Sequence, residues 1–116
     1  MFGEGWVLYC LCHPDMHVDA SDKNEMTFYV GISKNLETRI MRHLVAADSD
    51  QNRPITQWIR SLSSEPILVP IAGGYKTFEE ARTAEDNAIE KLRALGSPLL
   101  NGLTPRERAA QKEMDA

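Results

Sequence analysis

WVLYCLC at residues 6–12 and TFYVGI at residues 27–32 are the stretches that decide the fold. Both are rich in aromatic and branched side chains, which is the composition of buried β-strands. The polar and acidic residues 13–26 between them predict a long surface loop. We therefore expect the two strands to form an antiparallel hairpin with an extended tip.

Periodic apolar side chains after the hairpin predict two helices. Leu36, Ile40 and Leu44 recur every four residues, which indicates a helix over residues 35–46. A second helix is expected to begin at Pro54, because proline suits the first helical turn and apolar side chains follow it with helical spacing.

The next apolar stretch, ILVPI at residues 67–71, predicts a third strand. Pro70 cannot donate a hydrogen bond to a neighbouring strand, so this strand is expected at an edge of the sheet. Gly73 and Gly74 are then expected to turn the chain.

A capping box made by Thr77 and Glu80 predicts a last core helix that runs to about residue 95, where Gly96 ends it. The elements follow the order β-β-α-α-β-α. This order implies an α+β fold, a small three-stranded antiparallel sheet flanked by helices.

Length and composition limit the function classes. A chain of 116 residues suits one domain, expected over residues 1–104, and residues 105–116 are expected to form a polar C-terminal tail that frays. No apolar run is long enough to cross a bilayer, and residues 1–12 lack the basic region of a signal peptide. We therefore expect a cytoplasmic protein with no membrane partner. With only Cys10 and Cys12, two apart on one strand, a disulfide scaffold is excluded.

The net charge bears on nucleic-acid binding. Thirteen Lys and Arg against seventeen Asp and Glu give a formal charge of −4, which disfavours a partner held by bulk electrostatics unless the positive charge is concentrated on one face. The candidates for such a face lie on the first predicted helix and its flanks, and they are Lys34, Arg39, Arg42, His43 and Arg53.

Several polar side chains interrupt apolar patterns. Glu85 falls within the apolar stripe of the last predicted helix, where a carboxylate must be paired, protonated or bound to a metal. Alternatively, the stripe is slightly rotated and Glu85 pairs with Arg82 or with an arginine of another element. Arg39 and His43 share one face of the first helix, where they either point at a phosphate or face solvent.

Two tyrosines stand in the middle of the two paired strands. Neighbouring antiparallel strands could present the hydroxyls of Tyr9 and Tyr29 on the same side, where a phenol can take part in proton transfer. The alternative is that both pack in the core with a hydrated tip. The cysteines and histidines within residues 10–17 lack the separated ligand pairs of structural zinc, so no metal site is expected there.

The order and spacing of these residues resemble the GIY-YIG nuclease superfamily, over about residues 6–102. The residues that carry the resemblance are VLY at 7–9, YVG at 29–31, Asn35, Leu36, Arg39, His43, Glu85 and LLN at 99–101. Three features depart from the family pattern: Val7 stands in place of Gly, the tyrosines are 20 residues apart, and Ile32 stands where several relatives carry Lys. The chain looks like the small single-domain members of phages and bacteria.

The resemblance implies an endonuclease that hydrolyses DNA phosphodiester bonds with Mg²⁺ or Mn²⁺ and no small-molecule cofactor. Glu85 would be the sole protein ligand of the metal, and Tyr9 would be the general base. Tyr29 would hold the nucleophile or a phosphate oxygen, Arg39 would stabilise charge on the phosphorus, and His43 would hydrogen-bond Tyr9 or the phosphate. The other implied site residues are Asn101, as structural support, and Lys34 and Arg42, as substrate-binding residues.

Two alternatives stay open. Ile32 and the acidic surface fit a weakly active or inactive module of the same fold that binds nucleic acid or protein. The long loop at residues 13–26 fits a phage accessory protein that engages a host protein, in which case the location is the host cytoplasm. Homodimer formation and the structure of the DNA substrate also stay open.

Overall fold

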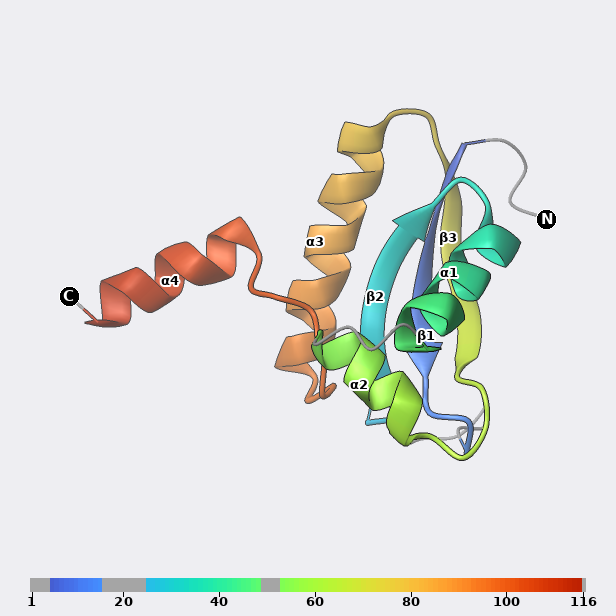
Figure 1. Ribbon diagram of the computed structural model, residues 1–116. Helices are drawn as coiled ribbons and strands as arrows, with labels where there is room; N and C mark the ends of the chain where they lie inside the picture. The colour runs from blue at the N-terminus through green and yellow to red at the C-terminus, as the bar shows by residue number, and fades with distance from the viewer. Residues whose placement is uncertain (1–4, 16–24, 49–52, 116) are drawn as a thin grey trace.

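The computed structural model describes residues 5–15, 25–48 and 53–115 (Figure 1). His17 and most of the loop expected at residues 13–26 lie outside the described residues. The elements in chain order are β1 (Trp6–Cys12), β2 (Thr27–Ser33), α1 (Leu36–Asp48), α2 (Pro54–Ser61), β3 (Ile67–Tyr75), α3 (Phe78–Ala94) and α4 (Pro105–Asp115). The α+β class and the order β-β-α-α-β-α are confirmed, with α4 as an additional helix.

The sheet is antiparallel, with strand order β2-β1-β3. β1 is the central strand, and its Tyr9 lies opposite Gly31 of β2 and Pro70 of β3. The edge position expected for the strand with Pro70 is therefore confirmed. The turn expected at Gly73 and Gly74 is wrong, because β3 continues to Tyr75.

The reason for that difference is an irregular end of β3. The register between β1 and β3 shifts twice between Trp6 and Tyr9, and Gly74 adopts a φ of 80°. Glycine tolerates this left-handed conformation without steric cost, so it serves an irregular strand as well as a turn.

Alternate residues of β1 build two cores on opposite faces of the sheet. Leu8, Cys10 and Cys12 pack with Ile89 of α3 on one face, whereas Tyr9 and Leu11 belong to the core that α1 and α2 cover on the other (Figure 1). This alternation follows from the two-residue period of a strand. It places Tyr9 beneath α1 and leaves α3 behind the sheet.

Side-chain caps begin both helices that border the site. Asn35 Oδ1 accepts from the Thr38 amide at 3.1 Å at the start of α1. At the start of α3, Thr77 Oγ1 accepts from the Glu80 amide at 3.1 Å, which confirms half of the predicted capping box. Gly96 follows α3 with a φ of 93°, as a C-terminal stop requires.

The tail that we expected to fray is a helix. Thr104 Oγ1 accepts from the Glu107 amide at 3.1 Å, and Glu107 Oε1 accepts from the Thr104 amide at 3.0 Å, so the two residues form a capping box. Pro105 occupies the first helical position, where its missing amide hydrogen costs nothing. Figure 1 shows α4 projecting away from the sheet and from α3.

None of the helices in the described part of the chain combines the length and the apolar character needed to span a bilayer.

Candidate active site

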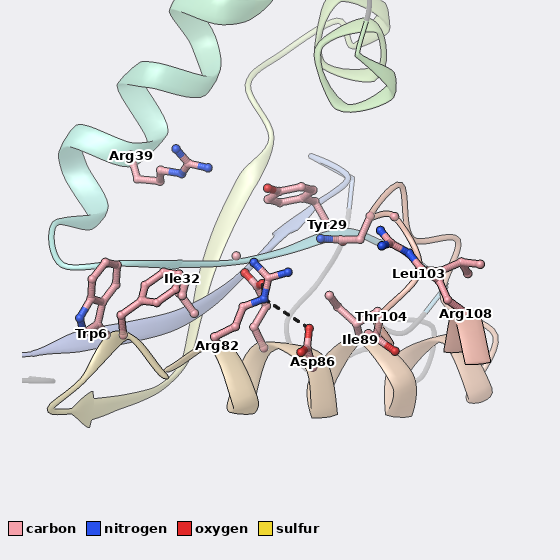
Figure 2. A pocket seen from close by; sticks show the side chains of 15 residues that line it. Trp6, Tyr29, Ile32, Arg39, Arg82, Asp86, Ile89, Leu103, Thr104 and Arg108 are labelled. Carbon is pink, nitrogen blue, oxygen red and sulfur yellow. Dashed lines mark ion pairs between the residues drawn. The ribbon is translucent and has the colours of Figure 1, made fainter. Parts of the chain in front are cut away.

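A pocket of about 480 Å³ opens along the free edge of the sheet, beside β2. Tyr29 and Ile32 of β2 line it, together with Arg39 of α1 and Glu85 of α3 (Figure 2). α1 and α3 cover opposite faces of the sheet, and Arg39 and Glu85 reach the pocket from these two helices. The pocket thus joins residues that are far apart in the sequence.

Tyr9 lies beneath this pocket with no exposed surface. Its hydroxyl accepts a hydrogen bond from Arg39 Nε at 3.0 Å and lies 2.9 Å from His43 Nε2. Arginine can only donate, so the single phenolic proton is the one that the His43 ring accepts. Desolvation by burial raises the pKa of Tyr9 to about 12, although the Arg39 guanidinium opposes that shift.

His43 is also buried, with 7% of its surface exposed. Burial, reinforced by the charge of Arg39, lowers the pKa of His43 to about 4. The imidazole is therefore neutral at neutral pH and acts as the hydrogen-bond acceptor for Tyr9. This contact is the hydrogen bond to Tyr9 that the resemblance implied.

Gly31 makes the burial of Tyr9 possible. A Cβ atom at Gly31 would lie 2.5 Å from Cζ of Tyr9 and closer still to the hydroxyl oxygen. The tyrosine ring of β1 therefore lies directly over the backbone of β2. Only glycine leaves room for it.

Tyr29 differs from Tyr9 in its access to solvent. It is half-buried, lines the pocket, and meets the His43 ring edge-on with 5.3 Å between ring centroids. Both tyrosines lie on the α1 side of the sheet, as the sequence suggested. Of the two, only Tyr29 lines the pocket.

Glu85 brings the acidic group to the pocket from the other face of the sheet. Its side chain is 13% exposed, and its Oε1 lies 3.6 Å from Nε of Arg82, whose side chain is 55% exposed. The pairing with Arg82 that the sequence left open is therefore present. Burial raises the pKa of Glu85, an effect that Arg82 opposes and Asp86 reinforces.

The surroundings of Glu85 fit a hydrated divalent cation. A half-buried carboxylate with a raised pKa gains from a nearby positive charge. Within the described residues, no group of three or more His, Cys, Asp and Glu side chains is arranged to hold an ion. A cation on Glu85 would therefore keep most of its water, which is how Mg²⁺ commonly binds, and the pocket has room for that water.

Asn101 supports β2 from outside the sheet. Its side chain accepts from the Val30 amide at 2.9 Å and donates to the Val30 carbonyl at 2.8 Å, and the Leu100 amide donates to Phe28 O at 2.8 Å. These bonds satisfy backbone groups that an edge strand would otherwise expose. They also hold the backbone on both sides of Tyr29.

Lys34 and Arg42 lie beside the main pocket rather than in it. Both line a smaller hollow of about 330 Å³ that shares Arg39, Ile32 and Trp6 with the main pocket. Lys34 Nζ lies 5.4 Å from the centre of the Trp6 ring. The two cations therefore extend the site from the residues before α1 to the middle of that helix.

Sequence reasoning missed several lining residues. Figure 2 shows Arg82 and Asp86 rising from α3 and Arg108 reaching in from α4. Arg82 Nε lies 3.6 Å from Asp86 Oδ1, close enough for an ion pair. Arg82 was considered only as a partner of Glu85, and Arg108 only as part of the tail. The capping box at residues 104–107 is the signal that would have predicted the helix carrying Arg108.

Comparison with known proteins agrees with this geometry. The model of the GIY-YIG catalytic domain matches residues 6–98, most of the chain, whereas Asn101 and α4 lie beyond the matched residues. Neither a curated protein nor a solved structure matches. Members of this family are generally endonucleases, and they typically depend on a divalent metal. The chain therefore belongs to the GIY-YIG family, and it carries the nuclease-type domain of that family.

Proposed function

We propose that the protein is a metal-dependent endonuclease that hydrolyses DNA phosphodiester bonds in the pocket beside β2. One observation carries this proposal: Glu85, Tyr29 and Arg39, from three different elements, line a single pocket. A carboxylate, a phenol and a guanidinium are the groups that phosphodiester hydrolysis needs for metal binding, orientation and charge stabilisation.

Glu85 would hold Mg²⁺ or Mn²⁺, and the bound ion would supply Lewis-acid polarisation of the phosphate. Arg39 would bind the phosphate oxygens. Its Nε is committed to Tyr9, so its terminal amino groups, beside Tyr29, are the donors that would meet the substrate. In the reaction a bond forms between the water oxygen and phosphorus, and the water gives up a proton to solvent. The bond from phosphorus to the leaving oxygen of the DNA breaks, and that oxygen takes up a proton from solvent.

We assign different roles to the two tyrosines. A general base must reach the proton that it removes, and the buried Tyr9 hydroxyl is already bonded to Arg39 and His43. We therefore propose that Tyr9 positions Arg39, in place of the general-base role that the resemblance implied. Tyr29, which lines the pocket, would orient the attacking water or a phosphate oxygen.

Conversion of supercoiled plasmid to nicked circles in Mg²⁺ or Mn²⁺ tests the activity. We expect Glu85→Gln to abolish nicking. Glu79→Gln, an exposed change on the same helix, should leave it intact. Nicking by Glu85→Gln at the wild-type rate, or no nicking by the wild type with either metal, would overturn the proposal.

A comparison of two phenylalanine variants tests the tyrosine roles. Tyr29→Phe should lower kcat with little change in Tm, because the hydroxyl lies in the pocket. Tyr9→Phe should lower Tm as well, because it leaves Arg39 and His43 without their shared partner. If instead Tyr9→Phe costs more activity than Tyr29→Phe at an unchanged Tm, Tyr9 is the base.

The Glu85–Arg82 ion pair favours a second candidate, a nucleic-acid-binding module without turnover, because the guanidinium already neutralises the carboxylate. This candidate predicts DNA binding by the wild type together with no nicking in Mg²⁺ or Mn²⁺. Since Arg82 is largely exposed, its ion pair costs little to break, and we rank hydrolysis first.

A further inference from the structure

We propose that Arg108 of α4 binds a DNA phosphate next to the scissile one, so that α4 forms a second wall of the substrate site. This inference rests on the proposed function. It concerns a helix that lies beyond the residues matched by the family model.

The first argument is position. Arg108 lines the same pocket as Tyr29, Arg39 and Glu85 (Figure 2). The pocket thus has cations from α1, α3 and α4. A DNA strand whose scissile phosphate lay between Arg39 and Glu85 would bring neighbouring phosphates to the rim, where Arg108 stands.

The second argument is that the pocket arginines differ in whether other side chains already engage them. Arg82 pairs with both carboxylates of the pocket, and Arg39 donates to Tyr9. The Arg108 side chain forms no hydrogen bond or ion pair with any residue in the described part of the chain. Its guanidinium is therefore not engaged by another side chain there, and it lines the pocket, where it is available to a phosphate.

The third argument is rigidity. Arg93 donates to Glu107 Oε1 at 2.7 Å and to the Asn101 carbonyl at 2.8 Å, and Thr104 Oγ1 donates to Glu90 Oε2 at 2.9 Å. These bonds tie the first turn of α4 to α3. Arg108 follows Glu107 directly, so its backbone is held in place before any substrate arrives, and binding loses less entropy.

The neighbouring Arg106 provides a matched control. It is exposed on the same turn, but it pairs with Glu90 at 3.4 Å and does not line the pocket. Replacing either arginine by alanine removes one positive charge from an exposed site. Any difference between the two variants therefore reports position rather than net charge.

The experiment measures the Kd of a fluorescent DNA duplex over a range of salt concentrations, in EDTA and in the Glu85→Gln background so that cleavage cannot interfere. We expect Arg108→Ala to weaken binding roughly five- to tenfold at low salt and to make the slope of log K against log salt shallower by about one unit. Arg106→Ala should change neither, and Arg108→Lys should retain most of the affinity.

Equal salt slopes for Arg108→Ala and Arg106→Ala would overturn the inference, as would equal affinities. The plasmid assay separates this failure from failure of the proposed function. A wild type that nicks DNA while Arg108→Ala binds like Arg106→Ala refutes only the role of α4. A wild type that binds no DNA refutes both.

Discussion

Substituting Gly31 by alanine tests whether the pocket depends on the ring of Tyr9 lying over β2. The added methyl group would overlap the Tyr9 ring, 2.5 Å from its Cζ atom, at a position where the ring is fully buried between β2 and α1. The ring must therefore move, and its hydrogen bonds to Arg39 and His43 must lengthen or break.

The expected cost has two parts. Overpacking a close-packed core by one methyl group costs about 1–3 kcal/mol. Loss of two buried hydrogen bonds adds about 1 kcal/mol each. A total of about 3–5 kcal/mol corresponds to a decrease in Tm of roughly 12–20 °C for a domain of this size. Nicking should fall too, because Arg39 loses the contact that holds its Nε.

Thermal unfolding followed by circular dichroism measures the decrease in Tm, with Gly102→Ala as the control. Gly102 also lines the pocket, but a Cβ there meets no atom within 4 Å, so its Tm should stay within a degree or two. If Gly31→Ala unfolds at the wild-type temperature, Tyr9 does not lie over β2 as described, and the reasoning on Arg39 is refuted.

Two further predictions concern the buried imidazole and the edge of the sheet. The pKa of His43 is about 4 in the folded chain and about 6.5 when exposed, so the unfolded chain takes up the proton first and stability falls as pH decreases from about 6.5 to about 4. Urea unfolding should show about 2 kcal/mol less stability from this group at pH 5 than at pH 7, and His43→Gln should remove that loss; an unchanged pH dependence in this variant would contradict the assignment. Asn101→Ala removes both bonds to the Val30 backbone and should cost roughly 2 kcal/mol in the same assay, whereas a stability equal to wild type would mean that water replaces the side chain fully.

Most of the fold was predicted from the pattern of apolar residues along the chain and from the helix caps. Residues 6–12 form β1 at the expected bounds, because a central strand covered on both faces needs an uninterrupted apolar run. The prediction of a turn at Gly73 and Gly74 was wrong because glycine is as typical of an irregular edge strand as it is of a turn. The prediction of a fraying tail over residues 105–115 was wrong because the alternating charges have no apolar periodicity and the capping box before them was not used. α4 needs no apolar face, because Arg93 anchors its first turn.

The motif spacing predicted which residues lie near one another better than it predicted how deeply each side chain is buried. The motif spacing grouped Tyr9, Tyr29, Arg39 and Glu85. In the structure Tyr29, Arg39 and Glu85 line one pocket, and the buried Tyr9 bonds Arg39 from the central strand. What the spacing could not predict is that, of the two tyrosines, Tyr29 lines the pocket and Tyr9 does not. The burial of Tyr9 depends on which strand is central, on the space above Gly31 and on the helix that covers the tyrosine ring. None of these can be read from neighbouring residues in the sequence.

Strand order explains why two equivalent-looking tyrosines differ. Tyr9 belongs to β1, which has a neighbour on each side, so its side chain is enclosed by the sheet and by α1. Tyr29 belongs to β2, which has a strand on one side only, and its half-buried side chain lines the pocket together with Arg39 of α1 and Glu85 of α3. Catalytic chemistry that needs residues from both faces of one sheet must therefore use an edge strand. The start of α4 adjoins the same edge, so in the proposed nuclease α4 would extend the substrate site without disturbing the groups that hold Arg39.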